Sequence, residues 1–424
     1  MTVLRIGGAL ASLLFGLAAG WSAASGAARL TTRPAVFLTA GLIAYAAVTV
    51  AAGWLLTRQL RPGEAMRIRV IGGGVAAALV LLPAAWTTLN PATPQTTPPP
   101  AGTTFWVLPD GSRIAALRVP GRAGAPGDPV VFLHGGPGVA DMDHDAPILG
   151  RLAETGRDVW FYDQIGAGRS SRLADPTGYS LGRDLADLEQ VRLRIGTPRM
   201  VLIGHSYGAT LAAAYLARHP EHVSRVVFSS PGRLVPEVGD VSGTGMVGRL
   251  DVRHQLRVLG TLLRPRAMLT YSLLKVSPRA AHALSGDDEM DSRFATLYRQ
   301  SAPGLVCPGN PVPATPERPG FYANQVPLNR SRPAPDIRPA LTGLRVPALI
   351  VKGGCDYLPW SFVADYRRSL PGSELVYFDD CGHQTYAEHP ERFLAVVTAF
   401  LADAPPPWPT WTALTPPSSY RGTA

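Results

Sequence analysis

The hydrophobic pattern divides the chain into an apolar N-terminal region and a longer region of short apolar runs between amphipathic stretches. Three uncharged apolar stretches open the chain, at approximately 6–28, 35–57 and 70–89. Each is near the roughly 20 residues that a helix needs to cross a bilayer. Their many glycines and alanines favour close helix packing in lipid. We predict three membrane spans within residues 1–90; a cleaved signal peptide followed by two spans is the alternative.

Arginines around these stretches predict an orientation. The N-terminal end and the second loop together hold five of them: Arg5, Arg58, Arg61, Arg67 and Arg69. The first loop holds only Arg29 and Arg33. Because basic loops tend to stay in the cytoplasm, three spans would place the rest of the chain outside the cytoplasm, beside the cell membrane.

Proline-rich segments flank the remaining region. Residues 91–103 form a Pro/Thr-rich linker, which favours an extended polyproline conformation. Residues 405–424 form an irregular tail, whose Trp408 and Trp411 would contact either the folded domain or the membrane interface.

Between linker and tail, short apolar runs bounded by turn residues predict strands, and several are separated by helical stretches. The predicted strands are 104–108, 113–119, 130–133, 159–162, 200–203, 225–228, 348–351 and 375–378. The predicted helices include 181–195, 256–263, 267–274, 294–298 and 393–401. This alternation predicts an α/β fold, a mostly parallel sheet with helices on both faces. The core would comprise residues 104–231 and 341–404, with 232–340 inserted as a helical lid.

The strongest chemical signal is Gly204-His205-Ser206-Tyr207-Gly208, which follows the strand 200–203 and precedes the helical stretch 209–216. A strand, G-x-S-x-G and a helix in that order predict a nucleophile elbow with Ser206 as nucleophile. Small residues two positions to either side let the strand and the helix approach closely.

A base and an acid should follow the nucleophile along the chain. His383 follows the strand 375–378 and a short loop, so we predict it as the general base. Asp356 follows the strand 348–351, at the same expected sheet edge, and we predict that it orients His383. Asp379 and Asp380 are rivals, but they share the loop of His383.

An oxyanion formed at this serine would need backbone N–H donors. Tyr207, which follows the nucleophile, is one predicted donor. The second is expected in the loop His134-Gly135-Gly136-Pro137-Gly138, with Gly136 preferred over Gly135. His134 precedes the nucleophile, and we expect it to brace this loop by hydrogen bonding.

These motifs carry a family resemblance. The His134–Gly138 loop, the segment Asp163-Gln164-Ile165-Gly166-Ala167-Gly168-Arg169-Ser170 and the elbow together resemble the prolyl iminopeptidase family of α/β-hydrolases, over roughly residues 104–403. The resemblance implies an α/β-hydrolase fold and a triad of Ser206, Asp356 and His383. Ile165 stands where the family usually has arginine, and Tyr207 where it usually has tryptophan. Both departures also occur in related tripeptidyl aminopeptidases and esterases.

An aminopeptidase must hold a free α-ammonium group, which calls for a carboxylate near the pocket. Glu237 and Glu289 are the candidates carried forward from the acidic residues of the insert, which also include Asp240, Asp287, Asp288 and Asp291.

Cysteine content and charge restrict the remaining possibilities. The three cysteines show no metal-ligand spacing, and we expect no metal or organic cofactor. Cys355 and Cys381 lie in the two loops expected to carry the acid and the base, so they form the preferred disulfide. A bond from Cys307 to either cysteine, or three free thiols, are the alternatives.

The net charge of +9 comes from 38 arginines and two lysines, and no nucleic-acid-binding motif accompanies it. We therefore expect attraction to anionic lipid rather than nucleic acid.

The sequence thus predicts a membrane-anchored serine hydrolase for a small peptide or acyl substrate, first of all an aminopeptidase of prolyl iminopeptidase type. An esterase or lipase is the second hypothesis. A non-catalytic binding protein with a hydrolase fold is the third.

Overall fold

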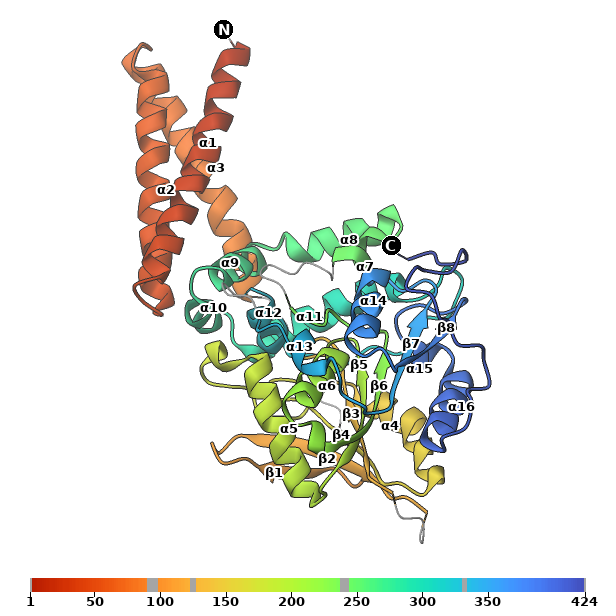
Figure 1. Ribbon diagram of the computed structural model, residues 1–424. Coiled ribbons are helices and arrows are strands. Elements are labelled where there is room, and N and C mark those ends of the chain that lie inside the picture. Colours follow the sequence, from red (N-terminus) through yellow and green to blue (C-terminus); the bar gives the residue numbers. More distant parts are fainter. Residues whose placement is uncertain (1, 90–97, 123–126, 237–243, 330–333, 423–424) are drawn as a thin grey trace. The chain divides into compact units, whose positions relative to one another are not determined.

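A computed structural model describes residues 2–89, 98–122, 127–236, 244–329 and 334–422 (Figure 1). The chain forms two compact units. The first comprises Met1–Ala92 and Gly260–Glu289, and the second comprises Thr93–Leu259 and Met290–Ala424. The expected insert, 232–340, is largely helical where it is described, and its residues are divided between the two units.

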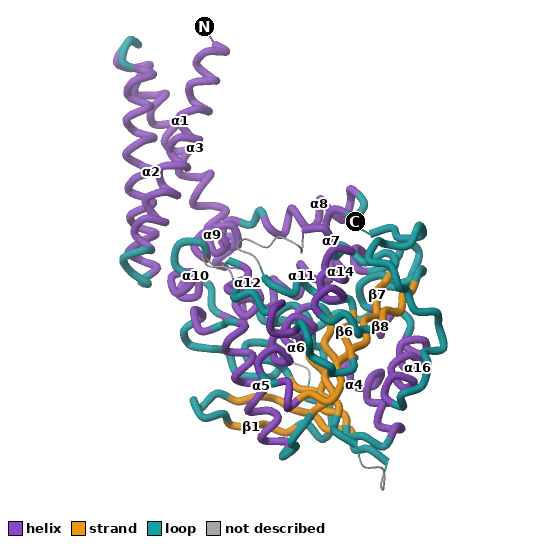
Figure 2. Tube along the Cα trace, viewed as in Figure 1, coloured by secondary structure: helices purple, strands orange, loops and turns teal. Residues whose placement is uncertain are grey.

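The first unit is helical (Figure 2). Its helices are α1 (Thr2–Ala28), α2 (Pro34–Thr57), α3 (Pro62–Leu89), α9 (Pro265–Leu274) and α10 (Pro278–Leu284). Helices α1 and α2 lie close together at Gly20 and Gly41, where a Cβ atom on either residue would lie 2.9 Å from the other's carbonyl oxygen. Tyr45 on α2 donates its hydroxyl proton to the carbonyl oxygen of Ala76 on α3, at 2.9 Å. Glycine therefore permits the close helix packing that the composition predicted.

The prediction of three membrane spans is corrected to two candidates. Among the described residues, Ala11–Ala28 and Pro34–Thr57 are long and apolar enough to cross a bilayer, with mean hydropathies of 1.2 and 2.1. The described residues of α3 give no third candidate, and this helix takes Glu64, Arg67 and Arg69 into its first turns. The finding rests on length and composition, criteria that a signal sequence or a soluble protein's core helix also meets.

An eight-stranded sheet organises the second unit, as the alternating pattern predicted. Its strands are β1 (Thr104–Val107), β2 (Arg113–Val119), β3 (Val130–Leu133), β4 (Val159–Tyr162), β5 (Met200–His205), β6 (Val223–Ser229), β7 (Ala348–Gly353) and β8 (Glu374–Phe378). They are ordered β1-β2-β4-β3-β5-β6-β7-β8. The pairs β1–β2 and β2–β4 are antiparallel, and all other pairs are parallel.

Helices cover both faces of this sheet (Figure 1). The α-helices that belong wholly to this unit are α4 (Met142–Leu149), α5 (Leu181–Ile195), α6 (Tyr207–Arg218), α7 (Thr244–Gly248), α12 (Phe321–Leu328), α13 (Arg338–Leu341), α14 (Trp360–Ser369), α15 (Thr385–Glu388) and α16 (Pro390–Leu401). Two further helices, α8 (Val252–Leu262) and α11 (Asp287–Ser301), have residues in both units. Short 3₁₀ turns are η1 (Gly150–Thr155), η2 (Pro176–Gly178), η3 (Pro220–His222) and η4 (Ala302–Leu305).

Two hydrophobic clusters fill the space between helices and sheet. Val131 and Leu133 of β3 belong to the cluster under α5, α6 and α14. Val130 and Phe132 belong to the cluster under α4 and α16. This alternation follows from the two-residue period of a strand, and both faces are apolar because both are covered.

The C-terminal tail contacts the edge strand β8, which decides between the two predicted locations for its tryptophans. The backbone N–H of Trp411 donates to the carbonyl oxygen of Leu375 at 2.7 Å. The ring of Trp408 packs edge-on against Phe378, with centroids 6.4 Å apart. Both tryptophans therefore pack on the second unit itself.

Candidate active site

Ser206 occupies a sharp turn between β5 and α6. Its backbone has φ 54° and ψ −115°, and residues other than glycine rarely adopt such a positive φ. A Cβ atom on Gly204 would overlap the carbonyl oxygen of Gly208, and one on Gly208 would overlap the carbonyl oxygen of Leu133. Both glycines are therefore required by the close approach of backbone segments, as the G-x-S-x-G pattern predicted.

Backbone hydrogen bonds hold this strained turn. The N–H of Ser206 donates to the carbonyl oxygen of Ser229 at 2.9 Å, at the end of the neighbouring strand β6. The carbonyl oxygen of Ser206 accepts from the N–H of Gly232 at 2.9 Å. Ser206 itself is buried. Strain of this kind persists only when the surroundings overdetermine it, and it is concentrated at functional sites.

His383 and Asp356 lie in direct contact, as predicted. The Nδ1–H of His383 donates to Asp356 Oδ1 at 2.8 Å, and both side chains are buried. The His383 ring also packs against the ring of His205, the residue before Ser206, with centroids 4.8 Å apart. The rivals Asp379 and Asp380 have exposed carboxylates that face Arg392 instead.

Asp356 has a second partner, the ammonium group of Lys352. Lys352 Nζ donates to Asp356 Oδ2 at 2.7 Å and to the carbonyl oxygen of Leu358 at 2.9 Å. Burial alone would raise the pKa of the Asp356 carboxyl, but Lys352 and His383 outweigh it and hold that pKa below its ordinary value. Burial lowers the pKa of Lys352, an effect that Asp356 opposes.

The glycine-rich loop after β3 lies against the elbow. A Cβ atom on Gly135 would come 3.2 Å from Ser206 Cβ, which brings this loop beside the predicted nucleophile. Gly136 adopts φ +116°, a conformation that favours glycine. The structure thus places both predicted loop donors in one tight turn next to Ser206.

His134 braces this loop, as expected. Its Nδ1–H donates to the carbonyl oxygen of Gly135 at 2.9 Å, and its Nε2 accepts from the backbone N–H of Gln164 at 2.9 Å. Burial lowers the pKa of His134 to about 4, so the ring is neutral at physiological pH and can both donate and accept. The histidine therefore ties the glycine-rich loop to the loop after β4.

The Asp163–Ser170 segment is organised by Asp163. Its Oδ2 accepts from the backbone N–H of Arg169 at 2.7 Å, and Ser170 Oγ donates to its carbonyl oxygen at 2.5 Å. A Cβ atom on Gly168 would overlap the Asp163 carboxylate. Burial raises the pKa of Asp163 to about 6, although Arg169 acts to lower it. These contacts explain why this segment needs aspartate, glycine and serine at these three positions.

Sequence reasoning overlooked two neighbours of Asp356. Lys352 was assigned to a loop, but β7 extends through it to Gly353. Its position directly after four apolar residues, in a chain with only two lysines, was the available signal. The tail was the other omission: Tyr420 donates its hydroxyl proton to the carbonyl oxygen of Leu358 at 3.0 Å. No local pattern in the tail indicates that contact.

The preferred disulfide is corrected. Cys355 is bonded to Cys307 and not to Cys381. The expected proximity is real, because the backbone N–H of Cys355 donates to the carbonyl oxygen of Cys381 at 2.8 Å. The side chain of Cys381, however, is buried in the cluster under α4 and α16 and remains a free thiol. Burial raises the pKa of that thiol.

The two preferred substrate-binding carboxylates, Glu237 and Glu289, stay predictions. Glu237 and Asp240 lie outside the described residues. Glu289 belongs to the first unit, where both of its carboxylate oxygens accept from Arg266 Nε at 2.8 Å. Asp291, in the second unit, pairs with Arg172 at 2.8 Å. The charges of Glu289 and Asp291 are therefore already compensated by arginine.

Comparison with known proteins shows the family of the chain. A family model described as the alpha/beta hydrolase fold matches residues 128–390, and the chain belongs to that family of hydrolases. It is similar to the proline iminopeptidase of Heyndrickxia coagulans, with 28% identity over 307 residues, which cover 69% of this chain and 96% of the relative. It is also similar to the proline iminopeptidase of Saccharolobus solfataricus, with 27% identity over 281 residues, covering 64% and 84%. The solved proline iminopeptidase of Mycobacterium smegmatis matches with 20% identity and a TM-score of 0.49, covering 71% of this chain and 98% of that one.

Proposed function

We propose that the protein is a serine hydrolase that cleaves its substrate by acyl transfer, and that it acts as an aminopeptidase of prolyl iminopeptidase type. The observation that carries the proposal is the 2.8 Å contact between His383 and Asp356, beside the strained turn at Ser206. The similarity to proteins named proline iminopeptidase supports the choice of an amide substrate.

In this mechanism Ser206 Oγ attacks the carbonyl carbon while Nε2 of His383 takes the hydroxyl proton. Asp356 accepts from Nδ1–H, which fixes the ring tautomer and stabilises the imidazolium. The imidazolium then returns the proton to the departing amine as the bond to the acyl carbon breaks. Water attacks the acyl-enzyme, and His383 again moves the proton, so that acid product and free Ser206 result.

The negative charge on the substrate oxygen needs donors during both steps. We assign this role to the backbone N–H groups of Tyr207 and Gly136, with Gly135 as the alternative. Their position supports the assignment, because Tyr207 is the first residue of α6 and the glycine-rich loop lies against Ser206. Both donors are backbone N–H groups, so this role does not depend on whether tyrosine or tryptophan occupies position 207.

We further propose that α1 and α2 anchor the chain in a membrane and that the catalytic unit faces an oxidising compartment. The two apolar helices support the anchor. The Cys307–Cys355 disulfide supports the compartment, since such bonds are rare in the cytosol. The arginines after α2 argue for the opposite orientation, because two spans with these arginines in the cytoplasm would keep the catalytic unit in the cytoplasm as well. Fusion of alkaline phosphatase, which is active only outside the cytoplasm, after Ala424 distinguishes the two orientations. An active reporter outside the cytoplasm is expected, and an inactive one overturns the assignment.

The enzymatic proposal is tested with purified full-length protein. A panel of aminoacyl amides, including prolyl amides, is compared with a panel of acyl esters. Amide turnover is expected, together with labelling by a fluorophosphonate probe, and both should be lost in Ser206→Ala. Turnover of esters alone would replace the peptidase by an esterase. Unchanged turnover in Ser206→Ala would contradict the assignment of the triad. Absence of both turnover and labelling in the native protein would indicate a binding protein.

A further inference from the structure

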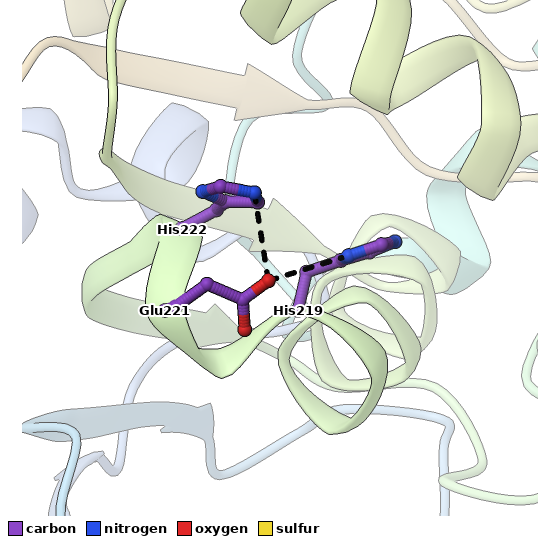
Figure 3. Close-up of side chains that lie close together, drawn as sticks. All are labelled: His219, Glu221 and His222. Atoms are coloured by element: carbon purple, nitrogen blue, oxygen red, sulfur yellow. Dashed lines mark ion pairs between the residues drawn. The ribbon is translucent and has the colours of Figure 1, made fainter.

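A cluster of two histidines and a glutamate lies away from the elbow, at the far end of α6. His219 follows the last residue of α6, while Glu221 and His222 belong to the 3₁₀ turn η3 (Figure 3). Ser206 precedes the first residue of the same twelve-residue helix. At about 1.5 Å per residue, the helix separates the cluster from the nucleophile by roughly 18 Å. The cluster is therefore distinct from the proposed active site.

The spacing of the donor atoms is that of metal ligands. Glu221 Oε1 lies 3.5 Å from His222 Nε2 and 3.7 Å from His219 Nδ1. All three ligand atoms lie within 4.8 Å of one another. A tetrahedral Zn²⁺ with bonds of about 2.0–2.1 Å holds neighbouring ligand atoms about 3.4 Å apart. Small rotations of the side chains would bring the three donors onto one ion.

The hydrogen bonding of His222 prepares its ring for coordination. Nδ1 lies 3.0 Å from the carbonyl oxygen of Pro198, and because a carbonyl only accepts, Nδ1 carries the proton. In the neutral ring Nε2 then presents its lone pair, and this is the atom that faces Glu221 (Figure 3). An outer carbonyl that fixes the tautomer of a histidine is a regular feature of metal sites.

The surroundings favour a cation and leave room for it. His219 is at the C-terminal end of α6, where the helix dipole attracts positive charge. Both histidine side chains are about a quarter exposed, and that of Glu221 is 61% exposed. The carboxylate is therefore free to reorient, and solvent can supply a fourth ligand. Imidazole nitrogen with a carboxylate suits zinc and neighbouring transition metals more than calcium or magnesium.

We propose that His219, Glu221 and His222 form a three-ligand site for a divalent transition metal of the zinc type. A bound ion would connect the end of the elbow helix to the turn that leads into β6, and, through His222 and Pro198, to the loop before β5. Because only the folded backbone holds the three donor atoms in this arrangement, binding would stabilise the native state. The site is structural, and the proposal does not depend on the hydrolase mechanism.

Zinc titration of the full-length, metal-stripped protein by calorimetry tests the proposal. One Zn²⁺ should bind per chain, and Co²⁺ in its place should give the visible absorption of tetrahedral coordination. Single variants His219→Ala and His222→Ala should each weaken binding by at least about tenfold. The matched control is His254→Ala, since His254 also pairs with one carboxylate, Asp251, at 2.8 Å, but no second histidine among the described residues joins that pair.

Glu221→Gln keeps the test decisive if a histidine variant fails to fold. Its side chain is exposed, so the fold should survive, while loss of the anionic ligand should weaken Zn²⁺ binding and abolish the rise in Tm that Zn²⁺ produces in the native protein. Absence of saturable Zn²⁺ binding by the native protein would overturn the proposal. Equal affinity in the native protein and the three cluster variants would overturn it as well.

Discussion

Lys352 Nζ lies 2.7 Å from Asp356 Oδ2, and neither side chain has any exposed surface. The carboxylate proposed to orient His383 thus divides its two oxygens between two partners, with Oδ1 toward His383 and Oδ2 toward Lys352. A buried ion pair contributes little net stability, but removal of one partner leaves the other charge buried without compensation. Lys352 is therefore a positioning residue for the proposed triad.

Lys352→Met should lower stability by about 3–5 kcal/mol and raise the pKa of Asp356. Since Lys352 helps to depress that pKa, the active ionised form should be lost at a higher pH in the variant, and the acid limb of the kcat/KM profile should shift upward. Urea unfolding and the pH profile measure the two effects. Lys275→Met, at the chain's other lysine and at an exposed position, is the control and should change neither. A merely structural Lys352 would leave the pH profile in place.

Gly208→Ala should disrupt the elbow, because the added methyl group would overlap the carbonyl oxygen of Leu133. Neither backbone segment can move without breaking the β3–β5 region, so we expect a loss of at least about 1–3 kcal/mol together with most of the activity. Gly260→Ala provides the comparison, since it lies in α8 with no atom within 4 Å of the new methyl group. That variant should be neutral or slightly stabilising. Similar unfolding curves for the two variants would contradict the steric account.

Asp163 predicts a specific pH dependence of stability. Its pKa in the folded protein is about 6, above the ordinary 3.8, because burial penalises the charged form. The folded state thus holds a proton that the unfolded state releases, so this group costs stability as pH rises from about 4 to 6. The shift of roughly two units corresponds to about 3 kcal/mol. Asp163→Asn should therefore lose less stability than the native protein between pH 4 and 7, as measured by urea unfolding at both pH values. An identical pH dependence of stability in the native protein and in Asp163→Asn would contradict the raised pKa of Asp163.

The Cys307–Cys355 disulfide closes a loop with a sequence separation of 48 residues. The entropy that it removes from the unfolded chain corresponds to about 4 kcal/mol. Dithiothreitol should lower Tm in the native protein but not in Cys307→Ser. Cys381→Ala should retain the response, because Cys381 is outside the bond. A peptide map that linked Cys355 to Cys381 would restore the pairing expected from the sequence.

Local pattern was sufficient for much of the fold and for most of the proposed site. All eight strands were predicted, and helix α5 was predicted with its bounds, since Ser180 caps its first turn and Gly196 adopts the left-handed conformation after its last. The strained turn at Ser206 was predictable because it requires glycine two positions to either side, and these glycines are visible in the sequence. The contact between His383 and Asp356 was predictable because parallel strands end at one edge of a sheet.

Contacts between segments distant in the sequence were decided only by the tertiary structure. The partner of Cys355 depended on which way the side chain of Cys381 points, and the apolar cluster under α4 and α16 takes that side chain. The tail was assigned to β8 by backbone hydrogen bonds that any sequence can make. One local contact was decided in the same way: Lys352 and Asp356 are only four residues apart, but their pairing required β7 to continue by two residues beyond its apolar run. Sequence periodicity thus determines elements and local turns, while burial and long-range backbone pairing determine which side chains meet.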